Sequence, residues 1–155
     1  MNKPEWTQRI VEEVARLEGK KPWKDSQVRF RQGRGWWSSG YAHFRWVGKY
    51  HGRTTKTVFD YVSITAGSDE KQRKHLLLHE LAHSYNRARS GHNQRFWEKA
   101  WGYYEHFRSE LDWEAVKKSE FEYKAGAKRV YDRLYPEVEA KQTYGQLSLD
   151  ILVTV

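Results

Sequence analysis

The sequence has no cysteine among its 155 residues. This absence excludes disulfide bonds, thiol nucleophiles, iron–sulfur clusters and every zinc finger or ribbon with cysteine ligands. Any metal ion must therefore be bound by histidine and carboxylate side chains.

Long hydrophobic runs are also lacking. No window approaches the roughly 20 apolar residues that a bilayer-spanning helix needs, and the opening residues MNKPEWTQRI contain no apolar signal segment. The sequence thus predicts a soluble, cytoplasmic protein that has no membrane partner.

Acidic residues are in the minority, with 20 Asp and Glu against 28 Lys and Arg, which gives a formal net charge of +8. Such an excess favours polyanionic partners by long-range attraction. Hydrophobic residues make up 38% of the chain and aromatic residues 15%, so the core must depend on large rings. The length fits a single domain over residues 1–155.

Helical patterns alternate with short β-like runs. A helix is expected to start after Pro4 and to stop near Glu18, ahead of Gly19. A second helix, with Ser68 as its cap, has a strongly apolar face and should be buried. The predicted helices span about residues 5–18, 69–89, 93–107 and 112–134.

Residues 26–65 have a different pattern, because glycines separate runs that are rich in β-branched and aromatic residues. This pattern predicts about three strands, with Val58, Val62 and Ile64 on one face of the last strand. The tail QLSLDILVTV alternates cleanly and is expected to form a further strand.

The second predicted helix contains the sequence HELAH, an HExxH pattern. His79 and His83 are four residues apart, so both imidazoles can reach one Zn²⁺ from a single helix face. Glu80 follows the first ligand and is expected to take a proton from a metal-bound water. The alternative is that both histidines are merely half-buried helix residues.

A catalytic zinc ion needs a third protein ligand and an open fourth position. His92 is the best candidate, because it follows a helix break at Ser90 and Gly91 where the chain can turn back. Other residues could also serve as the third ligand: Glu98, Glu105, Glu110, His106 and His75.

The sequence HELAHSYNRARSGHNQRFW, together with the strand, turn and helix before it, resembles the SprT-like (Spartan-type) zinc metallopeptidases over residues 58–97. The resemblance implies a zincin-like α+β fold, with a small sheet packed against the HExxH helix and further helices. It also implies a Zn²⁺ cofactor bound by His79, His83 and His92, Glu80 as catalytic base, and hydrolysis of peptide bonds, often in DNA-associated proteins. Unlike many relatives, this chain lacks a cysteine-rich zinc ribbon.

The peptide substrate is expected to add as a strand to a sheet edge, and the run YAHFRWV or its predecessor GRGWWSSG could form the wall of that groove. The donor that stabilises the tetrahedral intermediate stays open, since no candidate has a diagnostic spacing. The candidates include several arginines and Tyr61, Tyr85, Tyr103, Tyr104 and His106.

Basic and aromatic residues alternate in the predicted sheet, a pattern typical of nucleic-acid binding by phosphate neutralisation and stacking. A solvated sheet face would have the same composition, and the tryptophans could instead be core anchors. The candidate DNA contacts are Arg29, Arg31, Arg34, Trp36, Trp37 and Arg45.

Three hypotheses follow. The first is a zinc-dependent endopeptidase that acts on a protein or peptide substrate, with DNA as a further partner. The second is a nucleic-acid-binding module with a structural zinc site and no peptidase activity. The third is a degenerate zincin that serves as a protein-interaction scaffold, although every proposed zinc and base residue is present.

Overall fold

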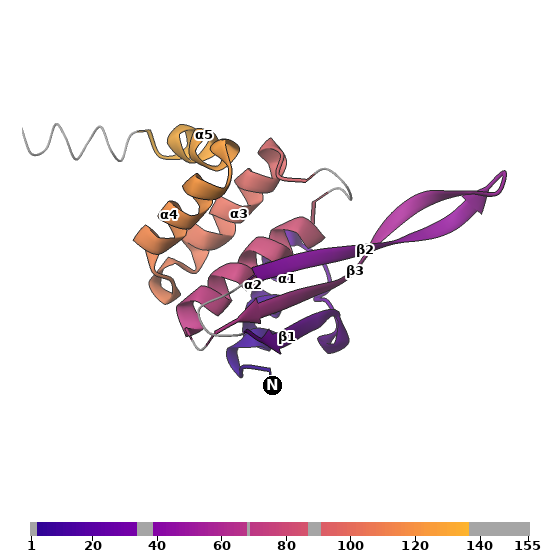
Figure 1. Ribbon diagram of the computed structural model, residues 1–155, viewed down its shortest axis with the longest axis horizontal. Coiled ribbons are helices and arrows are strands. Elements are labelled where there is room, and N and C mark those ends of the chain that lie inside the picture. Colours follow the sequence, from indigo (N-terminus) through magenta and orange to yellow (C-terminus); the bar gives the residue numbers. More distant parts are fainter. Residues whose placement is uncertain (1–2, 34–38, 68, 87–90, 137–155) are drawn as a thin grey trace, which may run out of the picture.

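The structure is a computed structural model that describes residues 3–33, 39–67, 69–86 and 91–136. Over these residues the protein is α+β, with a sheet on one side and helices stacked against it (Figure 1). The helices and strands are α1 (Trp6–Glu18), β1 (Val28–Gln32), β2 (Ser39–Tyr50), β3 (Arg53–Ala66), α2 (Glu70–Ser84), α3 (Gln94–His106), α4 (Trp113–Tyr123) and α5 (Ala125–Leu134), with short 3₁₀ turns η1 (Asp25–Gln27) and η2 (Arg108–Glu110).

Among the described residues the sheet has three strands in the order β1-β3-β2, which confirms the strand number predicted for residues 26–65. β1 runs parallel to β3, and β2 runs antiparallel to it. β2 and β3 form a hairpin that turns at His51 and Gly52, both of which have positive φ angles. The hairpin projects well beyond the helices (Figure 1), and β2 forms one edge of the sheet.

A bulge in β3 changes which residues face the core. His43 pairs with Tyr61 and the next residue, Phe44, pairs with Phe59, so Asp60 is an extra residue in the ladder. Phe59 therefore packs against the core, as does Val62. The prediction that Val58 shares the face of Val62 was wrong, because the extra residue shifts the alternation by one position.

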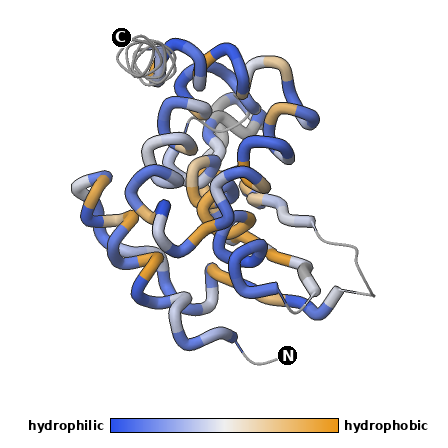
Figure 2. Tube along the Cα trace, turned by 90° about the vertical axis from the view of Figure 1, so that its left-hand side faces the viewer, coloured by the Kyte–Doolittle hydropathy of each residue, from blue (hydrophilic) through white to orange (hydrophobic). Residues whose placement is uncertain are grey.

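α2 lies between the sheet and the other helices, and this position explains its composition. Leu77, Leu78, Leu81 and Ala82 are fully buried, and α2 packs against both β3 and α3. The most hydrophobic stretches of the chain gather in this central layer, with hydrophilic segments around it (Figure 2). The side chains of the HExxH motif are therefore held by a helix that the core fixes on both sides.

Aromatic rings fill the space beyond α2, as the composition predicted. Phe96, Trp97, Trp101 and Tyr104 on α3 are at most 1% exposed. The indole N–H of Trp101 donates to the Ala127 carbonyl on α5 at 3.0 Å, which joins the two helices. None of the helices in the described part of the chain has both the length and the apolar character of a membrane span.

Two predicted helix boundaries were wrong. α2 ends at Ser84 rather than near residue 89, and its N-cap is Asp69, whose side chain accepts from the Gln72 amide. The predicted helix over 112–134 is broken at Lys124, which has an extended backbone (φ −146°, ψ 131°). By contrast, α1 ends at Glu18 with Gly19 in the left-handed conformation, as expected.

Candidate metal centre

α2 presents His79 and His83 on one helix face, one turn apart, as the i, i+4 spacing requires. His79 is 7% exposed, and the ring centroids of the two histidines are 5.3 Å apart. Because α2 packs against β3 on one side and α3 on the other, the helix is fixed and holds both imidazoles on the same face.

His92 returns to this face just before α3 begins. Gly91 has φ +60°, a conformation that side-chain-bearing residues rarely adopt, and it redirects the chain at this point. Asn93 then caps α3 by accepting from the Phe96 amide at 2.9 Å, and its Oδ1 also accepts from Asn86 Nδ2 at 3.1 Å. The cap thus anchors the residue next to His92 to the segment that follows α2.

The Nε2 atoms of the three histidines converge. His92 Nε2 lies 3.1 Å from His79 Nε2 and 3.0 Å from His83 Nε2. Tetrahedral ligands at ~2.1 Å from a zinc ion are about 3.4 Å from one another, so the two distances from His92 Nε2 are within a few tenths of an ångström of this value, and all three ligand atoms lie within 4.8 Å of one another.

The rival third ligands lie elsewhere and are bound to other groups. Glu110 accepts from Lys74 at 3.0 Å, Glu98 from Gln94 at 2.9 Å, and Glu105 from Tyr135 at 3.1 Å. His106 pairs with Glu13 at 2.9 Å. Among the described residues, the group of potential metal ligands that the structure brings together is His79, His83 and His92.

A buried carboxylate from α4 supports His79. Glu120 Oε2 lies 2.8 Å from His79 Nδ1 and accepts from the Tyr104 hydroxyl at 2.7 Å. An ionised carboxylate only accepts hydrogen bonds, so His79 Nδ1 carries a proton and donates it to Glu120, as the Tyr104 hydroxyl does. The Nε2 lone pair of His79 is then free for a metal. His75 Nε2 lies 3.7 Å from the other oxygen of Glu120, beyond hydrogen-bonding distance.

The pKa values of the histidines differ with their surroundings. Burial, followed by the charge of His79, lowers the pKa of His83 to about 3 and that of His92 to about 4. Both are therefore neutral near pH 7, as metal ligands must be. Burial also acts to lower the pKa of His79, but Glu120 outweighs it and raises that pKa. His79 in turn lowers the pKa of the Glu120 carboxyl, against the effect of its burial.

Glu80 lies against β2. A Cβ atom on Gly40 would be 3.0 Å from Glu80 Cγ and 3.1 Å from its Oε1, so a larger residue at this position would force Glu80 to shift. Glu80 is 4% exposed, and this burial raises the pKa of its carboxyl to about 7. A carboxylate with a pKa near the working pH is well suited to accept a proton and to return it.

A cavity of about 370 Å³ opens beside the three histidines. The edge strand β2 forms one wall, and Tyr123 at the end of α4 contributes to the lining. The Tyr123 ring is 54% exposed, and its centroid lies 5.1 Å from that of His92. The residues around the cavity are Gly40, Tyr41, Ala42, Phe44, His79, Glu80, His83, Gly91, His92 and Tyr123.

The hydroxyl and imidazole candidates for the oxyanion donor are placed outside this cavity. Tyr104 is bound to Glu120, Tyr103 donates to Glu18, and Tyr61 lies against Tyr41 on the sheet. Tyr85 stacks on Trp23, and His106 pairs with Glu13. Sequence reasoning missed Tyr123, whose position depends on the helix break at Lys124.

The candidate DNA contacts divide into two groups. Arg34, Trp36 and Trp37 lie outside the described residues. Arg29, Arg31 and Arg45 alternate with core-facing residues, so they lie on the sheet face that points away from α2. Arg29 covers Tyr61 with its guanidinium 3.6 Å from the ring centroid. The predicted strand at 146–155 also lies outside the described residues.

We expect Glu120→Gln to weaken zinc binding by about 10- to 100-fold, the usual cost of losing a partner that orients a metal-binding histidine. Glutamine keeps the size of the side chain and can still accept from Tyr104, so the helix packing should persist. Competition with a chromophoric chelator measures the affinity. Glu122→Gln, an exposed change on the same helix, is the matched control, and equal affinities for the two variants would contradict the role of Glu120.

Comparison of the chain with family models, with curated proteins and with solved structures finds no match.

Proposed function

We propose that the protein is a zinc-dependent endopeptidase of SprT-like type, with His79, His83 and His92 as zinc ligands. The observation that carries this proposal is the convergence of three imidazole nitrogens, with Glu80 beside them, in a cavity walled by an edge strand. When bound, zinc would polarise the scissile carbonyl and make a water molecule more acidic.

Glu80 would act as general base and then as general acid. Its carboxylate accepts a proton from the attacking water, and the same proton passes to the leaving amine nitrogen when the C–N bond breaks. The Tyr123 hydroxyl, on the opposite wall from β2, is the proposed donor to the developing oxyanion.

β2 would hold the substrate in an extended conformation. Because β2 is an edge strand, one side of its backbone has no neighbouring strand within the described sheet. A peptide can add there by main-chain hydrogen bonds, which are independent of side-chain identity. Gly40 to Phe44 line the cavity from this edge, so an added peptide would pass Glu80.

Metal content tests the proposal directly. We expect about one zinc per chain by mass spectrometry of the purified protein, and casein cleavage that stops on removal of zinc by a chelator and returns when zinc is restored. Histone cleavage with and without single-stranded DNA tests DNA-associated proteins as substrates. A metal-free protein after careful preparation, or cleavage that persists without zinc, would refute the proposed enzyme.

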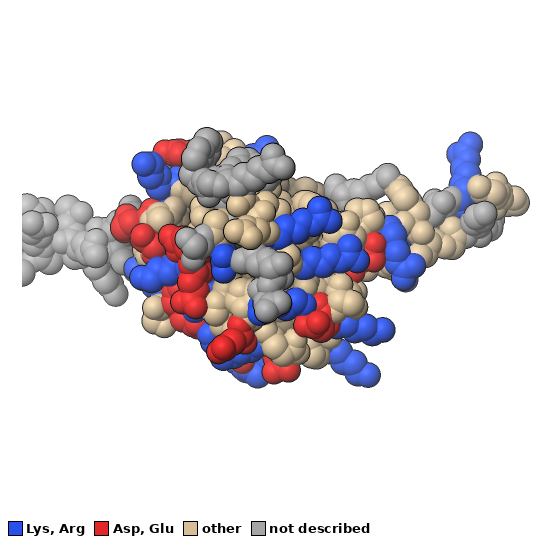
Figure 3. Space-filling view, turned by 60° about the horizontal axis from the view of Figure 1, so that its bottom comes forward, with Lys and Arg blue, Asp and Glu red and all other residues tan. Residues whose placement is uncertain are grey.

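Nucleic-acid binding is a second candidate function, and the hairpin favours it. Between Tyr41 and Phe59 the sequence has no acidic residue, and Arg45, Arg53 and Lys56 are exposed. Figure 3 shows Lys and Arg side chains out to the tip of the hairpin, with most Asp and Glu on the body. Arg31 and Arg45 have no ion-pair partner in the part of the chain that the structure describes.

We expect single-stranded DNA to bind with an affinity that falls steeply as salt rises, because each neutralised phosphate releases counterions. Mobility-shift titrations across salt give the slope. The double variant Arg31→Ala, Arg45→Ala should reduce the slope of log affinity against log salt by about 2, the value for two lost phosphate contacts. Arg95→Ala on α3 should leave the slope unchanged. Absence of binding at low salt would remove this function.

A further inference from the structure

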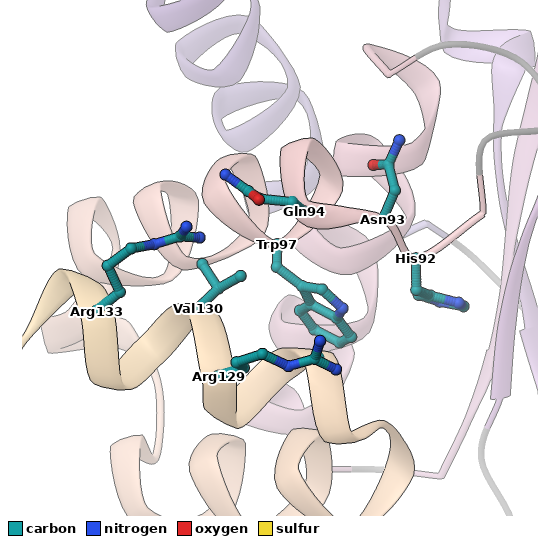
Figure 4. Close-up of a pocket in the computed structure, with 8 residues that line it drawn as sticks. His92, Asn93, Gln94, Trp97, Arg129, Val130 and Arg133 are labelled. Atoms are coloured by element: carbon teal, nitrogen blue, oxygen red, sulfur yellow. The ribbon is translucent and has the colours of Figure 1, made fainter.

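A second cavity of about 490 Å³ lies on the other side of His92 from the metal centre. The residues that define it come from the start of α3 and from one face of α5. Figure 4 shows Arg129, Val130 and Arg133 projecting from α5 toward α3, with Trp97 between the two helices and His92 at one end. We name this cavity the α3–α5 pocket. It shares His92 with the catalytic cavity.

The pocket carries hydrogen-bond donors that have no acceptor. Arg129 has neither a hydrogen bond nor an ion pair with any described residue. Arg133 lies 3.8 Å from Glu98, and both side chains are about half exposed (54% and 46%). This distance permits only a weak, solvent-screened attraction between Arg133 and Glu98. A closer anionic group could therefore replace Glu98 as the partner of Arg133.

Trp97 supplies a further donor. Its side chain is 1% exposed, and its indole Nε1 has no hydrogen-bond partner among the described residues. A Cβ atom on Gly126 would lie 3.2 Å from Nε1 and 4.0 Å from the His92 carbonyl oxygen. Nε1 therefore lies against Gly126 in the pocket wall, and buried donors usually have partners.

Two of these donors, the guanidinium groups of Arg129 and Arg133, are permanently charged, and they favour an anionic ligand. Trp97, Val130 and the aliphatic stems of the arginines make part of the wall apolar, and Asn93 and Gln94 add polar groups at the start of α3. Such a pocket fits a carboxylate on a short methylene stem, as in glutamate or aspartate. Phosphates in nucleic acids are on a hydrated backbone and fit better on the open, basic face of the sheet.

We propose that the α3–α5 pocket binds an acidic side chain of the peptide substrate, a few residues from the scissile bond. This inference rests on the proposed peptidase function, because His92 connects the pocket to the catalytic cavity. It gives the enzyme a substrate class: peptide segments with Asp or Glu close to the cleavage site. The basic excess of the chain would also attract such segments over longer distances.

Matched peptides test the proposal. A single Glu is moved stepwise along an otherwise neutral, internally quenched peptide, and each member has a partner with Gln at the same position. All peptides are acetylated and amidated, so that no terminal carboxylate can enter the pocket. A second set of peptides with free C-termini tests whether a C-terminal carboxylate binds in place of the Glu side chain. We expect about tenfold higher kcat/KM for Glu than for Gln at one position, the size of one charge-assisted hydrogen bond.

The preference should disappear in the double variant Arg129→Ala, Arg133→Ala, whereas Arg95→Ala, an exposed change on α3, should keep it. Arg129→Glu should reverse it in favour of a Lys peptide, and this gain of activity cannot result from misfolding. Equal rates for Glu and Gln peptides, or a preference that survives the double variant, would overturn the proposal. A preference for the free C-terminus alone would also overturn it.

Peptide binding separates this inference from the peptidase itself. In the Glu80→Gln background, fluorescence anisotropy should show the same Glu-over-Gln ratio, which again depends on the two arginines. If the wild type cleaves no peptide but this ratio holds, the pocket stands and the peptidase assignment falls. If single-stranded DNA displaces the Glu peptide from the wild type but does not bind the double variant, the pocket is a phosphate site and the proposal is wrong.

Discussion

Glu80→Gln should retain zinc at the wild-type stoichiometry and lose cleavage by about 10²- to 10⁴-fold, the range that general acid–base catalysis supplies. Glutamine has the shape of glutamate, so it fits against Gly40, but it cannot accept the proton from water. The metal ligands are separate side chains and remain in place. Metal content by mass spectrometry and initial rates on a quenched peptide, measured on the same sample, check both parts.

Glu114→Gln is the control for this experiment, because Glu114 is exposed on α4 and lies outside both cavities. It should have wild-type metal content and activity. A Glu80→Gln protein with more than about a tenth of the wild-type rate would exclude Glu80 as the proton carrier. Loss of zinc in Glu80→Gln would instead indicate that the carboxylate helps to hold the site together.

His92→Ala should lose both metal and activity. Loss of a residue that hydrogen-bonds to a metal ligand costs up to about 100-fold in metal affinity. Loss of a ligand itself should therefore weaken zinc binding by more than about 100-fold. A competition titration with a chelating dye measures this affinity, and far-UV circular dichroism confirms that the helices persist. Cleavage should fall in proportion to the zinc that is lost.

His106→Ala provides the comparison for His92→Ala. His106 was a rival ligand by sequence, but the structure places it against Glu13 on α1, so its removal should leave zinc in place. Full zinc retention in His92→Ala would contradict the three-histidine site. The third ligand would then have to be Glu98, Glu105 or Glu110, and the segment around α3 would have to move to bring one of them to His79 and His83.

Local patterns predicted much of the fold. The i, i+4 histidines, the strand-forming runs and the left-handed Gly19 are all determined within a few residues, and the structure has them where expected. The histidine that returns to the cluster could also be anticipated, because the glycine before it marks a break in the helical pattern. That these residues bind zinc stays a prediction.

The surroundings of the site could not be predicted in the same way. Glu120 meets His79 across 41 positions of sequence, and no spacing rule connects residues so far apart. Tyr123 is the last residue of α4 and lines the cavity, but the continuous helical pattern gave no signal that this helix ends there. The bulge in β3 could not be predicted either, because one unpaired residue reverses the alternation of faces without a change in composition.

The proposed zinc site would also make the stability of the fold depend on zinc. His79 and His83 belong to α2 and His92 precedes α3, so an ion bound by them would crosslink two segments of the chain, while Glu120 on α4 holds His79 in place. Unfolding would have to release that ion. Stability would therefore rise with free zinc, by about 1.4 kcal/mol for each tenfold increase above the dissociation constant. A cell that withdrew zinc would thus both silence this protein and expose it to degradation.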